Sequence, residues 1–284
     1  MTCQLGDPDA VTLTPKQFHG LQRRVAAAPD SPLDGELTEQ FLCSLGLPRP
    51  AARRILQLLA RDDLLDRYLD AMHRLNITVL TRLSPLYPRI LEERLGSSAP
   101  AALFFKGDLR LLSGPWISLV GSRRLESRGR AFAERVGSLA FLEGYVLVSG
   151  GAEGADRAAQ NACLAQGGDV LIFTPDRLSD KALEEHVLFC SEDGFELDFS
   201  PSRALSRNRL IHALGEKTFV AQCNYERGGT WRGSLENLKN GYSPLFLIRD
   251  GSRGADELLK LGAHELFELN SISALCGEQI CFES

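Results

Sequence analysis

The sequence predicts an α/β protein in which a Rossmann-like, doubly wound and mostly parallel sheet follows a small N-terminal all-α domain. From residue 77 onward, short apolar runs alternate with longer amphipathic segments, the pattern of parallel strands joined by crossover helices. Several of these runs end abruptly in glycine and small polar residues. Before residue 77 the spacing is helical and is interrupted by proline. We therefore divide the chain into a helical domain (residues 1–76), a Rossmann-like domain (77–270) and a C-terminal tail (271–284).

The first well-defined unit of the predicted sheet spans residues 117–143. Residues 117–120 are apolar and β-branched enough for a strand that is buried on both faces, and Gly121, Ser122 and Arg123 end it. Apolar side chains at three- and four-residue spacing then predict a helix over residues 127–143. The turn between them brings backbone N–H groups to a helix N-terminus, where a phosphate can bind, and Arg123 adds a charged donor.

A second unit of the same kind follows directly. Residues 145–149 predict a strand, which breaks into a glycine turn that includes Gly150 and Gly154, and a helix opens near Asp156. Asp156 is expected either to cap this helix or to orient the turn. Because doubly wound sheets bind ligands outside the carboxyl ends of their strands, we expect both glycine turns to lie at one binding edge.

The remaining elements continue the alternation. Further strands are expected at residues 77–80, 103–105, 170–174, 195–199, 218–223 and 245–248. Further helices are expected at residues 14–28, 36–45, 50–75, 180–188, 204–214, 233–239 and 254–263. A third glycine turn, with Gly228 and Gly229, follows the strand at 218–223.

Composition limits the class of protein. The chain has 284 residues, of which 44% are hydrophobic and 24% are charged, as in ordinary globular proteins. No apolar run reaches the ~18 residues of a membrane span, and the N-terminus does not resemble a secretory signal, so we expect a cytoplasmic protein. The seven cysteines show no C-x-x-C spacing, which predicts free thiols and neither a metal site nor disulfides. No cofactor is expected.

Local charge points to an anionic ligand, although the formal net charge of the chain is -5. Between residues 200 and 232, basic side chains outnumber the acidic Glu216 and Glu226. The basic residues in this stretch and around the first glycine turn are Arg123, Arg124, Arg128, Arg130, Arg203, Arg207, Arg209, Lys217, Arg227 and Arg232. Their clustering near predicted turns favours a basic cleft.

Six segments appear in the order and spacing of one known family: YPRILEERLGSSAPAALFFKGD, LVGSRRLESRG, VSGGAEGADRAAQNACLAQGGDVLIF, LSRNRLIHAL, ERGGTWRGSLENLKNG and GADELLKLGA. Through them the chain resembles the DNA-processing protein A family (DprA/Smf) over residues 77–263. It is similar to a divergent member without the C-terminal winged-helix domain that many members carry. The helical N-terminus resembles that family's small sterile-alpha-motif or helix-hairpin-helix-like domain.

The resemblance implies a cytoplasmic protein that binds single-stranded DNA, protects incoming DNA during natural transformation and loads the recombinase RecA, usually as a homodimer and without catalysis. Arg207, Asn208 and Arg209 match an arginine-asparagine-arginine motif that is expected at a helix start facing the cleft, the alternative being ion pairs at the rim of the sheet. The full set of implied DNA- or phosphate-binding residues is Gly121, Ser122, Arg123, Ser149, Gly150, Gly154, Arg207, Asn208, Arg209, Gly228 and Gly229.

The chain departs from the family pattern within these motifs. Gln160 stands where a histidine is usual, and Gln222 stands where an acidic residue is common. Glu126 occupies the place of a serine, and Gly233 the place of a threonine. These changes are typical of a divergent branch.

Two alternative functions are left open. One is a phosphoribohydrolase-like enzyme of the same superfamily, although Gly228, Gly229, Gly233 and Glu236 give only a loose version of that enzyme's loop. The five histidines are dispersed and pair with no obvious catalytic partner in the sequence. The other alternative is a sensor that binds a nucleotide in the same cleft. Trp231 is a candidate to stack on a base in either binding model, although a lone tryptophan more often packs within the protein.

Overall fold

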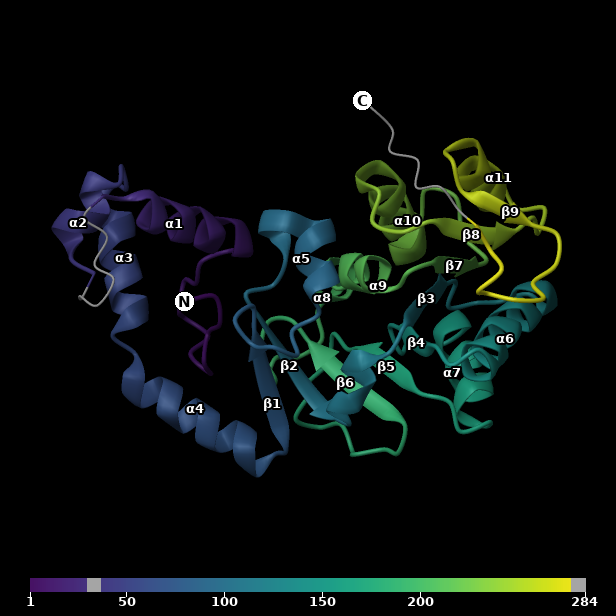
Figure 1. Ribbon diagram of the computed structural model, residues 1–284, viewed down its shortest axis with the longest axis horizontal. Helices are drawn as coiled ribbons and strands as arrows, with labels where there is room; N and C mark the ends of the chain where they lie inside the picture. The colour runs from purple at the N-terminus through teal and green to yellow at the C-terminus, as the bar shows by residue number, and fades with distance from the viewer. Residues whose placement is uncertain (30–36, 277–284) are drawn as a thin grey trace.

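The computed structural model describes residues 1–29 and 37–276. These residues contain one nine-stranded sheet with the order β1-β2-β6-β5-β4-β3-β7-β8-β9 (Figure 1). The strands are β1 (Ile77–Thr81), β2 (Ala102–Gly107), β3 (Trp116–Gly121), β4 (Val146–Ser149), β5 (Val170–Phe173), β6 (Val187–Ser191), β7 (Thr218–Ala221), β8 (Leu245–Ile248) and β9 (His264–Leu266). All neighbours pair in parallel except β2, which runs antiparallel to β1 and β6. The prediction of a doubly wound, mostly parallel sheet is confirmed.

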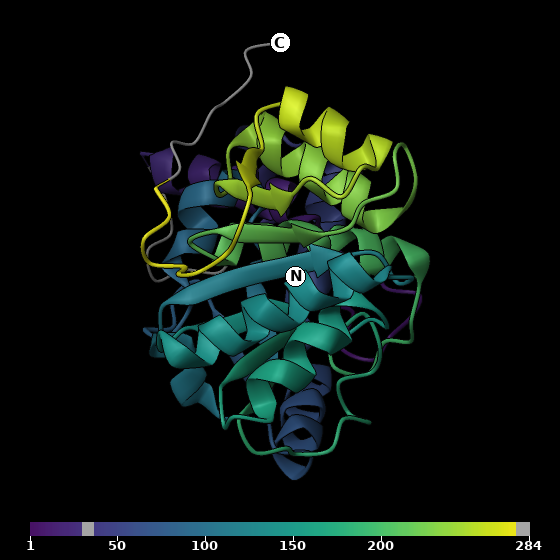
Figure 2. The same ribbon diagram turned by 90° about the vertical axis from the view of Figure 1, so that its right-hand side faces the viewer.

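Helices cover both faces of the sheet. The helices are α1 (Pro15–Ala27), α2 (Glu39–Ser44), α3 (Arg49–Leu59), α4 (Asp62–Arg74), α5 (Arg89–Leu95), α6 (Ser127–Leu142), α7 (Ala155–Leu164), α8 (Pro201–Ser206), α9 (Asn208–Leu214), α10 (Gly228–Asn240) and α11 (Arg253–Lys260), with short 3-10 turns η1 (Gly96–Ser98) and η2 (Leu109–Ser113). Figure 2 shows α10 and α11 on one side of the strands and α6 and α7 on the other. None of the described helices is long and apolar enough to cross a membrane.

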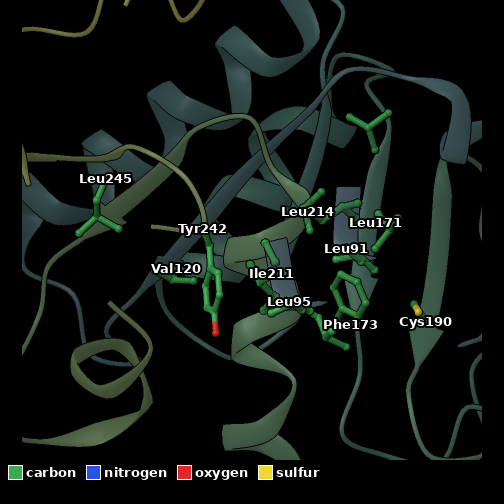
Figure 3. Packing of buried hydrophobic residues seen from close by; sticks show 14 of the residues in the cluster. Leu91, Leu95, Val120, Leu171, Phe173, Cys190, Ile211, Leu214, Tyr242 and Leu245 are labelled. Atoms are coloured by element: carbon green, nitrogen blue, oxygen red, sulfur yellow. The ribbon is translucent and has the colours of Figure 1, made fainter. Parts of the chain in front are cut away.

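Successive side chains along a strand point to opposite faces of the sheet, so the core has two layers. Leu147 packs beneath α6 and α7, whereas its neighbours Val146 and Val148 join the layer beneath α5, α9, α10 and α11. In the layer beneath α5, α9, α10 and α11, Leu91 of α5 and Ile211 of α9 pack near Phe173 of β5 (Figure 3). Strands that are buried on both faces have to be apolar throughout, which is why the parallel strands read as continuous hydrophobic runs.

The N-terminal helices α1 to α3 lie beyond the β1 edge of the sheet (Figure 1) and have a core of their own, which includes Leu21, Leu42 and Ile55. Helix α4 packs against the sheet instead, because its Tyr68 and Met72 join the core of the sheet, with Tyr68 beside Phe104. The predicted helix over residues 50–75 is therefore two helices, α3 and α4. Residue 36, the first of the helix expected at 36–45, lies outside the described residues.

Two predicted elements between β5 and α8 are wrong. Residues 180–188 are not a helix: His186 has a left-handed φ of 63°, which a helix does not accept, and the apolar run after it is β6. Residues 195–199 are not a strand, because the carbonyls of Leu197 and Asp198 accept hydrogen bonds from the Arg203 guanidinium and not from a neighbouring strand. The segment from β6 to α8 is instead an anchored loop that reaches the binding edge of the sheet.

Candidate nucleic-acid interface

A cleft of about 740 Å³ opens at the carboxyl ends of β3 and β7. The chain proceeds from β3 to β4, β5 and β6 on one side, whereas β7, β8 and β9 continue the sheet on the other side. The cleft thus lies at the topological switch point, where doubly wound sheets bind their ligands. It is lined by Val120, Gly121, Ser122, Arg123, Arg124, Ala152, Asp156, Phe199, Pro201, Ala204, Leu205, Arg207, Asn208, Ile211, Asn224, Arg227, Gly228, Gly229, Thr230 and Arg232.

Arginines from three segments converge on the cleft. Arg123 and Arg124 come from the loop after β3, Arg227 and Arg232 come from the start of α10, and Arg207 lies between α8 and α9. The first four are exposed and make no ion pair within the part of the chain that the structure describes. Their charge is consequently available to an anionic ligand.

Ser122 shapes the loop after β3. Its hydroxyl donates to the Arg124 carbonyl at 2.7 Å and accepts from the Arg124 N–H at 3.1 Å. Its own N–H donates to the Gln222 carbonyl at 3.0 Å. These groups are already bonded within the protein, so the anion-binding capacity of this turn resides chiefly in Arg123 and Arg124.

Asp156 organises the second glycine turn. Its buried carboxylate accepts hydrogen bonds from the N–H groups of Gly150 at 3.2 Å and Ala152 at 3.1 Å. The expectation that Asp156 orients the turn is therefore confirmed, and the residue at the cap of α7 is Gly154. Burial raises the pKa of the Asp156 carboxyl, while the positive charge of Arg207 and the two N–H groups act in the opposite direction.

The Arg207 side chain packs against the same glycine turn. Its side chain is only 8% exposed, and burial lowers the pKa of its guanidinium while Asp156 favours the charged form. The guanidinium fills the space beside Gly150, where an added Cβ would stand 1.6 Å from Nη1. Arg207 thus combines a place in the cleft lining with a buried role beneath it.

The arginine-asparagine-arginine motif is divided between two environments. Asn208 lines the cleft, and its Nδ2 donates to the Gly229 carbonyl at 3.2 Å. Arg209 points away from the cleft lining, forms an ion pair with the buried Glu192 at 2.6 Å and donates to the Ser98 carbonyl at 2.7 Å. The break between α8 and α9 falls at Arg207, so the two arginines have different neighbours.

Seven of the predicted site residues line the cleft and four do not. Those in the lining are Gly121, Ser122, Arg123, Arg207, Asn208, Gly228 and Gly229. Ser149, Gly150, Gly154 and Arg209 are outside it. Ser149 is buried, and its hydroxyl accepts from Gln160 at 2.6 Å. A contact between any of these residues and DNA stays a prediction.

The two glutamines that depart from the family pattern both bond into the binding edge. Gln160 donates to Ser149 at the end of β4, and the Gln222 side-chain oxygen accepts from the Glu126 N–H at 2.8 Å. An uncharged amide in each place satisfies a polar group of the loops. Both glutamines are accommodated by hydrogen bonds and add no negative charge to the cleft.

Several cleft residues were missed from the sequence. Thr230 lies in the lining, and its hydroxyl donates to the Gly121 carbonyl at 2.8 Å, which joins α10 to β3. Phe199 and Asn224 also line the cleft. The arginine excess signalled a basic cleft but not which arginines face it. Of the two interpretations of Trp231, packing is confirmed and base stacking is wrong, because this indole is only 7% exposed and packs edge-on against Tyr225.

His212 on α9 is a buried, neutral histidine. Neither of its ring nitrogens has a hydrogen-bond partner within the described residues. Burial lowers the pKa of the imidazole to about 3, so the ring is uncharged near neutral pH.

The free energy of unfolding is expected to fall as the pH drops below 6.5, the ordinary pKa of histidine. Below this pH His212 binds a proton in the unfolded state, whereas in the folded state it stays neutral until the pH approaches its lowered pKa of about 3. At pH 5.5 this linkage amounts to about 1.4 kcal/mol. Urea unfolding near pH 7.5 and 5.5 measures it. His212→Gln should lose less stability between the two pH values than the wild type, whereas the exposed His73→Gln should match the wild type. Equal pH dependence in all three proteins would contradict this account.

Comparison with known proteins identifies the family. The family model described as DNA recombination-mediator protein A matches residues 78–276. The DNA processing protein DprA of Streptococcus pneumoniae is 33% identical over 196 residues, which are 64% of this chain and 68% of that protein. DprA of Bacillus subtilis is 28% identical over 224 residues, which are 73% of this chain and 74% of that protein.

Solved structures agree in fold. The X-ray structure of DprA from Streptococcus pneumoniae is similar with a TM-score of 0.65 at 26% identity, over 89% of this chain and 95% of that one. The structure of DprA from Helicobacter pylori, described with a single-stranded DNA binding mode, is similar with a TM-score of 0.59 at 24% identity, over 68% of this chain and 92% of that one. The chain therefore belongs to the family of DNA recombination-mediator protein A, the DprA/Smf proteins.

Proposed function

We propose that this protein binds single-stranded DNA in the cleft and does so without catalysis. The observation that carries the proposal is the convergence of five arginines on one cleft whose lining contains one acidic side chain among the described residues. Guanidinium groups form charge-assisted, often bidentate hydrogen bonds with phosphate and stay charged at physiological pH. In a chain with a formal net charge of -5, such a cleft attracts a polyanion to one place.

The distribution of the arginines favours a strand of nucleic acid over a mononucleotide. Arg123 and Arg124 lie on the β3 side of the cleft, whereas Arg227 caps the start of α10 and Arg232 lies on that helix. A strand offers one phosphate per nucleotide, so successive phosphates can engage both groups. The binding mode described for the relative from Helicobacter pylori supports the same class of ligand.

Within this proposal, Arg123, Arg207 and Asn208 contact the DNA backbone, while Gly150 and Gly154 shape the loops that present them. The protein protects incoming single strands in the cytoplasm during natural transformation, delivers them to RecA and acts as a homodimer. These wider roles rest on family membership, whereas the ligand rests on the cleft.

A phosphoribohydrolase-like reaction has weaker support. Glu236, the carboxylate in the loose version of that enzyme's loop, is outside the cleft lining and accepts a hydrogen bond from the Tyr242 hydroxyl at 3.2 Å. Release of a free base from a nucleoside monophosphate would nevertheless establish the enzyme. A nucleotide recovered from the purified protein by mass spectrometry would establish a sensor.

Affinity for a labelled single-stranded oligonucleotide is expected to fall steeply with salt. The slope of log affinity against log salt is about -0.7 for each phosphate neutralised, so four engaged arginines predict a slope of roughly -3. Fluorescence anisotropy at several salt concentrations measures it. Arg123→Gln should reduce the slope by about 0.7 and weaken binding by about 1 kcal/mol.

Arg67→Gln provides the matched control, because Arg67 is an exposed arginine of α4 outside the cleft lining. It should leave both the affinity and the slope unchanged. Absence of binding at low salt would overturn the proposed function, and an equal effect of the two substitutions would overturn the assignment to this cleft.

A further inference from the structure

Phe199 is an exposed aromatic side chain in the wall of the cleft. It is 51% exposed, and of the large hydrophobic side chains that are exposed in the described residues, it alone lines the cleft. Pro201, Ala204 and Leu205 continue the wall beside it. The cleft therefore has an apolar wall that faces the same space as the arginines, and phosphate binding does not account for that wall.

The loop that carries Phe199 is fixed on both sides of this residue. Asp198 forms a two-point ion pair with Arg177 at 2.6 and 2.8 Å. The Arg203 guanidinium donates to the carbonyls of Pro175, Leu197 and Asp198. After Phe199, the Ser200 hydroxyl accepts from the Arg203 N–H at 3.1 Å and caps α8.

The start of the loop is held as well. The Glu196 carboxylate accepts hydrogen bonds from the Tyr68 hydroxyl at 2.6 Å and from the Phe195 N–H at 3.0 Å. Phe195 itself is buried and packs against Tyr68 with ring centroids 4.6 Å apart. Phe199, by contrast, contacts no other aromatic ring within the described residues. An anchored backbone thus presents an unpartnered ring to the cleft.

The chemistry of the cleft identifies what the ring accepts. Arginines on the β3 loop and on α10 attract a phosphate backbone, and a single strand offers unpaired bases beside that backbone. A base has an apolar face that stacks on an aromatic side chain whatever its sequence. Trp231, the other aromatic candidate, is buried and is not part of the cleft lining. Among the described residues, Phe199 is therefore the aromatic side chain that a base in the cleft can reach.

We propose that Phe199 is a base-stacking residue: one base of the bound strand turns into the cleft and lies on the Phe199 ring, while the flanking phosphates engage the arginines. The assignment rests on the proposed function and adds to it the means by which the site selects single strands. In a duplex each base is stacked and paired, so its face is not available to Phe199. Loss of the ring therefore costs single-strand affinity and leaves phosphate-driven binding in place.

The test combines two oligomers with three variants of the full-length chain. Anisotropy is measured with an oligothymidylate and with a sugar-phosphate oligomer of equal length that lacks bases. Phe199→Ala is expected to weaken binding to oligothymidylate by about 5-fold to 150-fold, the range of one base stack, and to leave binding to the abasic oligomer unchanged. Phe199→Trp should preserve the preference for the oligomer with bases.

Phe267→Ala is the control, because Phe267 is an 89% exposed phenylalanine outside the cleft lining. It should bind both oligomers as the wild type does. Equal binding of oligothymidylate by Phe199→Ala and the wild type would overturn the stacking site alone. A wild-type protein that binds neither oligomer would instead overturn the proposed function, and a parallel loss on both oligomers in Phe199→Ala would show that the ring only supports the loop.

Discussion

Arg207→Met is expected to lower the free energy of unfolding by about 2 to 4 kcal/mol near neutral pH. The substitution removes the cation that most favours the charged form of buried Asp156, so the carboxylate is left in a poorly solvated place. Because the pKa of folded Asp156 is already raised by burial and rises further without Arg207, protonation relieves the penalty. The deficit relative to the wild type should therefore shrink as the pH falls toward the ordinary pKa of aspartate, about 4.

The double variant Asp156→Asn/Arg207→Met separates this stabilising role from DNA binding. An asparagine oxygen can still accept from the Gly150 and Ala152 N–H groups without needing a countercharge. The double variant should regain most of the lost stability in urea titrations, yet bind single-stranded DNA at least about tenfold more weakly than the wild type. Arg123→Met, at an exposed position, should change stability by no more than about 0.5 kcal/mol. If Arg207→Met is as stable as the wild type, Asp156 does not depend on it.

Gly154→Ala is expected to cost about 3 kcal/mol. Gly154 has a φ of +88°, and a Cβ there would stand 2.3 Å from the Ser122 carbonyl oxygen and 2.6 Å from the Arg123 carbonyl carbon. Both contacts are with backbone that rotamer changes cannot relieve. The loop that presents Arg123 has to move, so DNA affinity should fall together with stability.

Gly167→Ala is the matched control for Gly154→Ala. Gly167 has a similar φ of +83°, but a Cβ there meets nothing within 4 Å. The Gly167→Ala variant should therefore lose only about 1 kcal/mol of unfolding free energy, the cost of placing alanine in a left-handed backbone conformation. Its affinity for DNA should equal that of the wild type. Urea midpoints of the two variants isolate the steric part. Equal losses would show that the close contact between the two glycine turns adds nothing.

The sheet could be predicted because its determinants are local. A parallel strand that is buried on both faces has to be a continuous apolar run, and runs such as residues 117–120 and 245–248 carry this signal without help from distant residues. The glycine turns after β3 and β4 mark where strands stop, so the binding edge follows from the same pattern. The short edge strand β9 was not expected.

The prediction for the segment between β5 and α8 was wrong because residues distant in the sequence determine its structure. The alternation of Phe195 and Phe199 suggested two side chains on one strand face. In the fold, Phe195 packs into the core beside Tyr68, whereas Phe199 lines the cleft. The carbonyls between them bond to Arg203, which the pattern of these five residues cannot reveal.

The arginine motif shows the same limit within the site. Arg207 and Arg209 are separated by one residue and have the same chemistry, so the sequence assigns both to the cleft or both to ion pairs at the rim. The helix break at Arg207 and the buried Glu192 at the end of β6 divide them. Partners of this kind are fixed by packing of the whole sheet and not by local spacing.

The pairing of β3 with β7 also determines when the cleft comes into existence as the chain is synthesised. Strands β3 to β6 follow one another in the sheet as in the sequence, so each can join its predecessor soon after it is made. β7 emerges about a hundred residues after β3, and only its docking on the free edge of β3 brings Arg227 and Arg232 opposite Arg123. A nascent chain that ends before residue 218 has an open strand edge and no basic cleft. The basic cleft is thus completed only after strands β3 to β6 are in place.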